Sequence, residues 1–225
     1  MTILTLWYED PMAQLAIAGA LGILWGLASD RLAARWPAHE DGSIRAIDWR
    51  TALVVAFGAV AFAATWARFG ADPRSLVVVG AYVVALVVMF ATDLDQRLLP
   101  DLLTLPLIGL AALATIVGWS PFIHSTDEIL WAVVAAIGFP LALALAARPF
   151  GAGAIGQGDL KLLVSVGLLA GALNLFYALI AGSLLAGVVL AVLIAVRRLS
   201  RKSFVPYGPF LIVGISWAML GLPQA

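Results

Sequence analysis

Two short segments contain aspartates that could carry out hydrolytic chemistry as a pair. Segment 92–101 reads Thr-Asp-Leu-Asp-Gln-Arg-Leu-Leu-Pro-Asp, and segment 156–161 reads Gly-Gln-Gly-Asp-Leu-Lys. Two carboxyl groups that share one proton can work together, one as a general base on water and the other as an acid toward a carbonyl. Such a pair needs no metal, thiol or imidazole, which suits a chain with no cysteine and only two histidines.

The place of each acid along the expected helices separates structural from chemical roles. Asp101 follows a proline and opens a helix, which favours an N-cap, and Asp95 can pair with Arg97 or stay hydrated. Asp93 follows the end of a helix, where the dipole disfavours a carboxylate, so stability does not explain it. Asp159 opens a helix, so the dipole predicts an ionised Asp159 and a protonated Asp93.

Two glycines beside Asp159 indicate a close approach of backbone. Gly156 and Gly158 remove side chains where another backbone could approach. Spacing alone does not separate a hydrolytic pair from a proton relay in a transporter.

The elements that must position these acids are membrane helices. Of the 225 residues, 63% are hydrophobic and 12% are charged, whereas a soluble domain carries about a quarter charged residues. This composition excludes an ordinary water-soluble enzyme, a nucleic-acid binder and a disordered chain. It predicts an all-α polytopic integral membrane protein, organised as a single domain over 1–225.

One long apolar stretch decides how often the chain crosses the bilayer. Segment 159–196 would measure about 57 Å as one helix, twice the thickness of the hydrocarbon core, so two helices with a turn near 171–174 fit better. Spanning helices need about 20 apolar residues. The other runs of roughly that length are 12–29, 51–69, 76–92, 101–119, 128–147 and 207–222.

Positive charge supports two helices in that stretch. Cytoplasmic loops collect Lys and Arg. With two helices, eleven of the thirteen Lys and Arg lie on one side, whereas one helix leaves seven against six. We therefore predict about eight helices, both termini outside, and cytoplasmic segments at 30–50, 93–100, 148–158 and 197–206. Both acidic segments then reach the same membrane face.

Three segments together resemble the bacterial type IV prepilin leader peptidases, membrane aspartic proteases with a Gly-x-Gly-Asp signature. Segment 93–101 resembles the family's Asp-x-x-x-x-x-Leu-Pro-Asp pattern, 156–162 its Gly-x-Gly-Asp-x-Lys-Leu pattern, and 205–210 its Pro-Phe/Tyr-Gly-Pro pattern. The resemblance runs from about residue 76 to the end and implies a peptidase core at 76–225. It implies that Asp93 and Asp159 are catalytic. The substrate-binding or site-shaping positions that it implies are Gly156, Gly158, Lys161, Pro206, Gly208 and Pro209.

The resemblance also implies a substrate and a location. The family removes a short basic leader from prepilins or pseudopilins of type IV pili and secretion systems, just before their hydrophobic N-terminal helix. We expect this at the cytoplasmic face of the bacterial inner membrane, in contact with the lipid bilayer, without metal, cofactor or nucleic acid. Arg97, Lys161 and segment 197–202 do not suit a basic leader, so we expect them to serve topology and lipid headgroup contact.

The N-terminal part departs from the family. Bifunctional members carry Gly-Ser-Phe-Leu-Asn-Val-Val-x-x-Arg-Leu-Pro and then an insert with two Cys-x-x-Cys pairs, which are tied to methylation of the new N-terminus by S-adenosylmethionine. Segment 26–37 keeps Gly26, Arg35 and Pro37, and no cysteine follows. We expect 12–50 to form a first helix and a shortened cytoplasmic loop, without N-methyltransferase activity.

Two other functions stay open on the sequence. A catalytically silent membrane scaffold would have no need of both aspartates and both glycines. A proton-coupled transporter that uses the two aspartates as a relay would place a polar stripe inside several helices, whereas the helix interiors here are mostly Ala, Leu, Val, Gly and Ile.

Overall fold

The computed structural model describes residues 10–39, 42–151, 155–196 and 207–221, and these residues form helices joined by short connections. The chain divides into two compact units, Met1–Gln96 and Arg97–Ala225. The first unit contains α2 (Pro11–Ala33), α3 (Trp49–Phe69) and α4 (Pro73–Gln96). The second contains α5 (Asp101–Ile116), α6 (Thr126–Ala147), the 3-10 turn η1 (Arg148–Phe150), α7 (Gln157–Ala195) and α8 (Gly208–Leu220).

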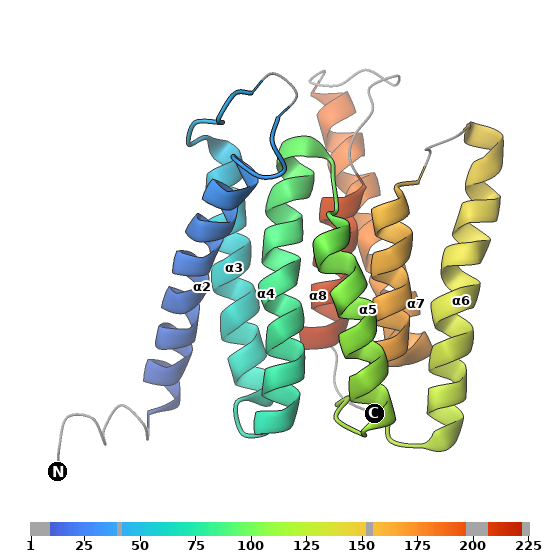
Figure 1. Cartoon of the computed structure of the whole chain (residues 1–225). Helices are drawn as coiled ribbons and strands as arrows, with labels where there is room; N and C mark the ends of the chain where they lie inside the picture. The colour runs from blue at the N-terminus through green and yellow to red at the C-terminus, as the bar shows by residue number, and fades with distance from the viewer. Residues whose placement is uncertain (1–9, 40–41, 152–154, 197–206, 222–225) are drawn as a thin grey trace, which may run out of the picture. The chain divides into compact units, whose positions relative to one another are not determined.

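Small residues hold the first unit together. Helices α2, α3 and α4 lie side by side (Figure 1). A Cβ on Gly22 of α2 would overlap the backbone carbonyl of Gly58 on α3, and a Cβ on Gly26 would lie 2.8 Å from the Cα of Val55. Within a bilayer, such small residues let two helix backbones approach closely, which replaces the hydrophobic drive available in water.

This close contact predicts the effect of a single methyl group. Gly22→Ala is expected to lower the free energy of unfolding by about 1–3 kcal/mol, because the backbone of α3 must move away. Gly19→Ala is the matched control on the same helix, since its Cβ would meet only the Ala59 carbonyl oxygen, at 3.9 Å. Thermal unfolding of the two purified variants in detergent measures the difference, and equal midpoints would contradict the close packing.

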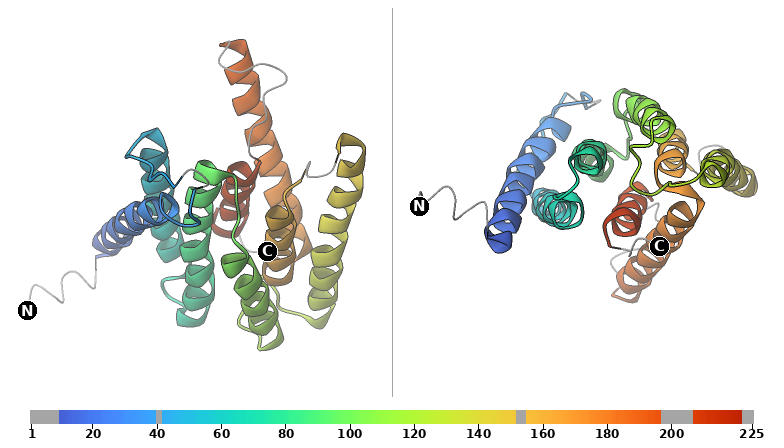
Figure 2. Two further views of the ribbon diagram at one scale, coloured as in Figure 1. Left: turned by 45° about the horizontal axis from the view of Figure 1, so that its top comes forward. Right: turned by 90° about the horizontal axis from the view of Figure 1, so that it is seen from below.

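The second unit is arranged around α7, which packs against α5, α6 and α8. Gly171 has φ 77° and ψ 177°, so the long helix is broken there into two segments. Figure 2 shows them as amber and orange helices that run in different directions. The turn predicted near 171–174 is therefore confirmed. The second segment lies close to α8, where Gly182 would place a Cβ 2.9 Å from the carbonyl oxygen of Phe210.

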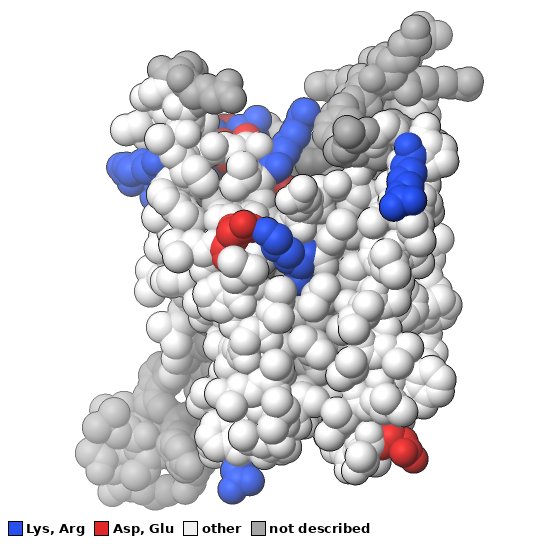
Figure 3. Space-filling model, turned by 45° about the vertical axis from the view of Figure 1, so that its right-hand side comes forward, with Lys and Arg blue, Asp and Glu red and all other residues white. Residues whose placement is uncertain are grey.

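The structure confirms a polytopic helical membrane protein. Helices α2, α3, α4, α6 and α7 are each long and apolar enough to cross a bilayer, whereas α5 and α8 are shorter apolar helices. The prediction of eight crossings therefore stays a prediction. On the face shown in Figure 3, the charged side chains lie toward the ends of the helices and leave a broad uncharged surface between them.

One helix boundary differs from the prediction in a way that matters for the site. The sequence predicted that α4 ends at Thr92, but it continues to Gln96. Arg97 then takes the left-handed conformation, with φ 57°, which is a common way for a helix to stop. Asp93 therefore lies inside the last turns of the helix rather than after it. Segment 197–206 lies outside the described residues.

Candidate active site

The last turns of α4 carry two acids with different surroundings. Asp93 is buried, with 5% of its surface exposed, near a helix C-terminus that has no basic residue in its own last turn. A carboxylate at this position opposes the helix dipole. Asp93 is therefore a buried acid at an electrostatically unfavourable end of its helix, and its catalytic role stays a prediction.

Asp95, two residues further on, contacts side chains from the loop before α3 and from the first turn of α3. Its carboxylate lies 3.1 Å from Nε2 of His39, 3.1 Å from Nη1 of Arg50 and 2.7 Å from Nε of Arg45. The sequence predicted pairing with Arg97 or hydration, so these three partners were missed. They are distant in the sequence, and only the fold brings them to Asp95.

Asp159 lies in the first turn of α7, three residues after the N-cap Gly156. The backbone N–H of Gly156 donates to its carboxylate, as in the returning half of a capping box. The other oxygen, Oδ1, is enclosed and has no hydrogen-bond partner within the described part of the chain. One oxygen of the Asp159 carboxylate thus has a hydrogen bond that favours its ionised form, and the other oxygen has none. The assignment of the proton to Asp93 and the charge to Asp159 stays a prediction.

The glycines beside Asp159 contact the chain itself. A Cβ on Gly158 would lie 2.6 Å from the Cβ of Leu99 and 3.0 Å from its carbonyl oxygen. A Cβ on Gly156 would lie 3.0 Å from Oδ2 of Asp159. The close approach of another backbone predicted for the two glycines is therefore found at Gly158, where the approaching residue is Leu99, whereas Gly156 meets only the side chain of Asp159.

An ion pair joins the same two segments. Nζ of Lys161 donates to Oδ1 of Asp101 over 2.6 Å. Asp101 is the first residue of α5 and Pro100 is the N-cap, which corrects the prediction that Asp101 caps the helix. Lys161 thus has a partner inside the protein, while its expected role in topology and lipid headgroup contact stays a prediction. Both side chains are partly exposed, so the pair contributes little to stability.

Tyr207 lies near Asp159, although the sequence did not single it out as a candidate site residue. Its hydroxyl lies 3.1 Å from Oγ of Ser183 on α7. Burial raises the pKa of the Tyr207 phenol, the Ser183 hydroxyl lowers it, and the nearby Asp159 carboxylate raises it. The net shift is upward, so the phenol stays protonated near neutral pH. Pro206 lies outside the described residues, whereas Gly208 and Pro209 are buried at the start of α8.

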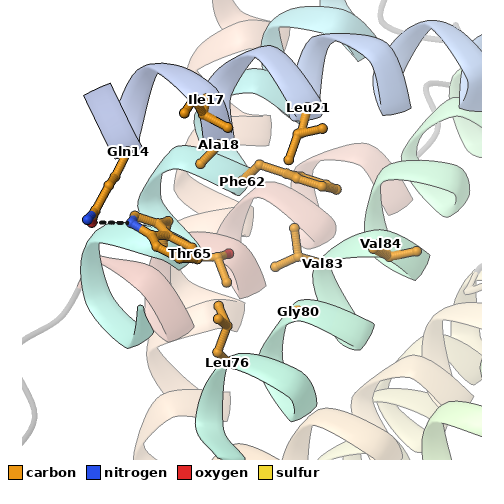
Figure 4. Close-up of a pocket in the computed structure, with 11 residues that line it drawn as sticks. Gln14, Ile17, Ala18, Leu21, Phe62, Thr65, Leu76, Gly80, Val83 and Val84 are labelled. Atoms are coloured by element: carbon orange, nitrogen blue, oxygen red, sulfur yellow. Dashed lines mark hydrogen bonds between the residues drawn. The ribbon is translucent and has the colours of Figure 1, made fainter. Parts of the chain in front are cut away.

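A cavity of about 510 Å³ lies elsewhere in the first unit and has an apolar lining. Figure 4 shows side chains of α2, α3 and α4 around it, with Nε1 of Trp66 donating to Oε1 of Gln14 at one end over 3.1 Å. Its lining includes neither Asp93 nor Asp95. Its chemistry does not suit hydrolysis.

The described residues thus assemble part of the predicted site. Within the second unit, the Leu99–Asp101 turn contacts the first turn of α7, and Tyr207 lies near Asp159. Asp93 belongs to the first unit, so its pairing with Asp159 stays a prediction. Across the described ranges, no group of three or more His, Cys, Asp or Glu residues could hold a metal ion.

These features define a class, a polytopic helical membrane protein with a buried aspartate near the end of one helix and a largely enclosed aspartate at the start of another. A family model described as the type IV leader peptidase family matches residues 80–192. This range contains both aspartates. The chain belongs to the type IV leader peptidase family.

Individual relatives agree with the family. A protein named prepilin leader peptidase/N-methyltransferase from Pseudomonas putida is 31% identical over 147 residues, which are 65% of this chain and 50% of the relative. One with the same name from Pseudomonas aeruginosa is 28% identical over 174 residues, 77% of this chain and 56% of the relative. The chain spans about half the length of the curated relatives it matches. No solved structure matches it significantly.

Proposed function

We propose that this chain is an aspartic endopeptidase that removes the basic leader from type IV prepilins or pseudopilins at the cytoplasmic face of the inner membrane. Asp93 and Asp159 are its catalytic pair, and the peptidase core spans 76–225. The chain crosses the membrane eight times, with both termini outside. Family membership and the names of the relatives support the reaction.

The observation that carries the proposal is the contact between Gly158 and Leu99. It joins the Gly-x-Gly-Asp segment to the Leu-Pro-Asp turn within one unit. The covalent chain also limits the distance, because Leu99 follows Asp93 by six positions, which can span at most about 20 Å. Asp93 is therefore tethered to the turn that packs against the helix start of Asp159.

The mechanism follows from two carboxyl groups that share a proton. The ionised carboxylate takes a proton from water, whose oxygen attacks the carbonyl carbon of the scissile peptide bond. The protonated partner gives its proton to the carbonyl oxygen. The carboxyl group that took the water proton then gives it to the leaving nitrogen as the C–N bond breaks. The other carboxylate takes a proton from a hydroxyl of the tetrahedral intermediate, which becomes the new carboxylic acid, so the pair returns to its starting state.

We also propose that the N-methyltransferase activity named for the relatives is absent here. The segment between α2 and α3 contains no cysteine. Its described residues contribute the ion pairs of Arg45 and Asp48 instead. A peptidase without methylation would release a substrate whose new N-terminus is a plain amine.

Co-expression with a tagged prepilin in a bacterial membrane tests both proposals. Leader removal is read by gel shift and N-terminal sequencing, and the mass of the product reports methylation. We expect cleavage directly before the hydrophobic helix and no added methyl group. A panel of prepilins and pseudopilins left intact by an inserted protein would refute the peptidase, and a methylated product would refute only the second proposal.

A further inference from the structure

A buried ion-pair cluster links the ends of all three helices of the first unit. Its centre is Arg45, whose side chain is only 11% exposed. The guanidinium contacts three carboxylates, through Nη2 to Asp30, through Nη1 to Asp48 at 2.7 Å and through Nε to Asp95 at 2.7 Å. Asp30 lies in the last turn of α2, Asp48 is the N-cap of α3, and Asp95 lies in the last turn of α4.

The cluster is balanced in charge and its centre is shielded from solvent. The Asp30 side chain is 0% exposed and that of Asp95 is 2% exposed. Burial lowers the pKa of Arg45, but its contacts with Asp30, Asp95 and Asp48 outweigh that and raise it overall, so the guanidinium stays charged. Three carboxylates thus face three guanidinium groups. The members are Asp30, Asp48, Asp95, Arg31, Arg45 and Arg50.

Further contacts join the end of α4 to the segment between α2 and α3. Nε2 of Gln96 donates to the carbonyl oxygen of Pro37 over 2.7 Å, and His39 contacts Asp95. The α4 end has no basic residue of its own. The cations that offset its acids therefore come from the loop before α3 and the first turn of α3 rather than from α4.

The geometry of the helix connects this cluster to Asp93. Residues two apart on an α-helix point about 200° apart, that is, to nearly opposite sides. A contact that holds Asp95 on the side of α2 and α3 therefore turns Asp93 to the other side of α4. Rotation of the helix end would move both side chains together.

We propose that Arg45 and Asp95 are positioning residues that set the orientation of Asp93. This inference rests on the proposed function, because it assigns Asp93 a catalytic task that depends on its direction. The cluster would then do more than stabilise the unit, since a small rotation of the α4 end misaligns the acid. Misplacement of a catalytic group by about 1 Å can cost about 10²-fold in rate.

Two conservative substitutions separate positioning from stability. Arg45→Lys keeps the positive charge but replaces the rigid fork by a single ammonium, and Asp95→Asn keeps the shape but removes the charge. We expect each to lower kcat for prepilin cleavage by about 10²-fold with KM nearly unchanged. Rates are normalised to folded protein purified from the membrane.

The matched control lies at the other end of the same helix. Asp72 accepts from the backbone N–H of Arg74 over 3.1 Å and from the Ser75 hydroxyl at the start of α4. Asp72→Asn weakens α4 without touching the end that carries Asp93. We expect its kcat to stay within about twofold of the parent, even where its thermal midpoint falls as far as that of Asp95→Asn.

A second readout needs no cleavage at all. The chain has no cysteine, so D93C introduces a single thiol whose alkylation rate by a small reagent reports the position of side chain 93. We expect this thiol, buried in the parent background, to react several-fold faster when D93C is combined with D95N or R45K. Combination with D72N should leave the rate unchanged.

The two readouts distinguish a failure of the proposed function from a failure of the positioning role. A parent chain that cleaves no prepilin overturns the proposed function, whereas the alkylation rates still report on the orientation of residue 93. Unchanged alkylation in both D95N and R45K, or unchanged kcat in both, overturns the positioning role. A loss of kcat in D72N equal to that in D95N overturns it too, because general destabilisation of α4 would then be sufficient.

Discussion

Asp93→Asn and Asp159→Asn are each expected to lower the rate of leader removal by about 10²–10⁴-fold. Asparagine keeps the shape of each side chain but cannot pass a proton between water and the peptide. The protein should still fold, because the side-chain carbonyl introduced by Asp159→Asn can accept from the Gly156 amide as the carboxylate does. Co-expression with a tagged prepilin and quantification of the processed fraction over time measure the loss.

The controls use one exposed acid from each unit. Asp72 precedes α4, and Asp127 lies in the first turn of α6. Their Asn variants should retain cleavage close to that of the parent chain. Residues that act as a unit are strongly non-additive, so the double variant D93N/D159N should be no slower than the slower single variant. Substantial turnover by either single variant would contradict the pair.

The sequence could predict the membrane helices and the candidate site segments because these features depend on local patterns of residues. Composition alone predicts a membrane protein, and the length of segment 159–196 predicts the break that the structure has at Gly171. The order of Asp93, the Leu-Pro-Asp segment and the Gly-x-Gly-Asp segment can likewise be read directly from the sequence. These features depend on neighbouring residues or on the thickness of a bilayer, and neither requires knowledge of the fold.

The missed features depend on contacts between distant residues. Arg45 counted only as a positive charge on one side of the membrane, yet its guanidinium joins three carboxylates from three helices. The partner of Gly158 turned out to be the Leu99 backbone, which no spacing rule indicates. The extra turn of α4 beyond Thr92 is stabilised by the contacts of Asp95 and Gln96 with segment 33–50. Because these contacts come from distant residues, the sequence pattern predicted an end of α4 at Thr92, four residues too early.

The packing of Gly158 yields a second large effect. Gly158→Ala adds one methyl group, which would meet Leu99 at 2.6 Å from its Cβ and 3.0 Å from its carbonyl oxygen. Because backbone cannot give way as the end of a side chain can, the first turn of α7 must shift relative to the Leu99–Asp101 turn. We expect a loss of about 1–3 kcal/mol in the free energy of unfolding and about 10²-fold in cleavage rate.

Two other Gly→Ala changes provide a graded comparison. Gly156→Ala would meet only the Asp159 carboxylate, with Oδ2 at 3.0 Å, which is the mobile end of a side chain, so its loss should be smaller and confined to activity. Gly187→Ala lies on the same α7 helix with open space around it, and alanine favours helix, so it should keep both activity and stability. Thermal unfolding and prepilin cleavage, measured on all three variants, rank them by their loss of stability and activity. If Gly158→Ala behaved like Gly187→Ala, the packing of the Leu99–Asp101 turn against the start of α7 would not depend on that close contact. The proposed function would then lose its main structural support.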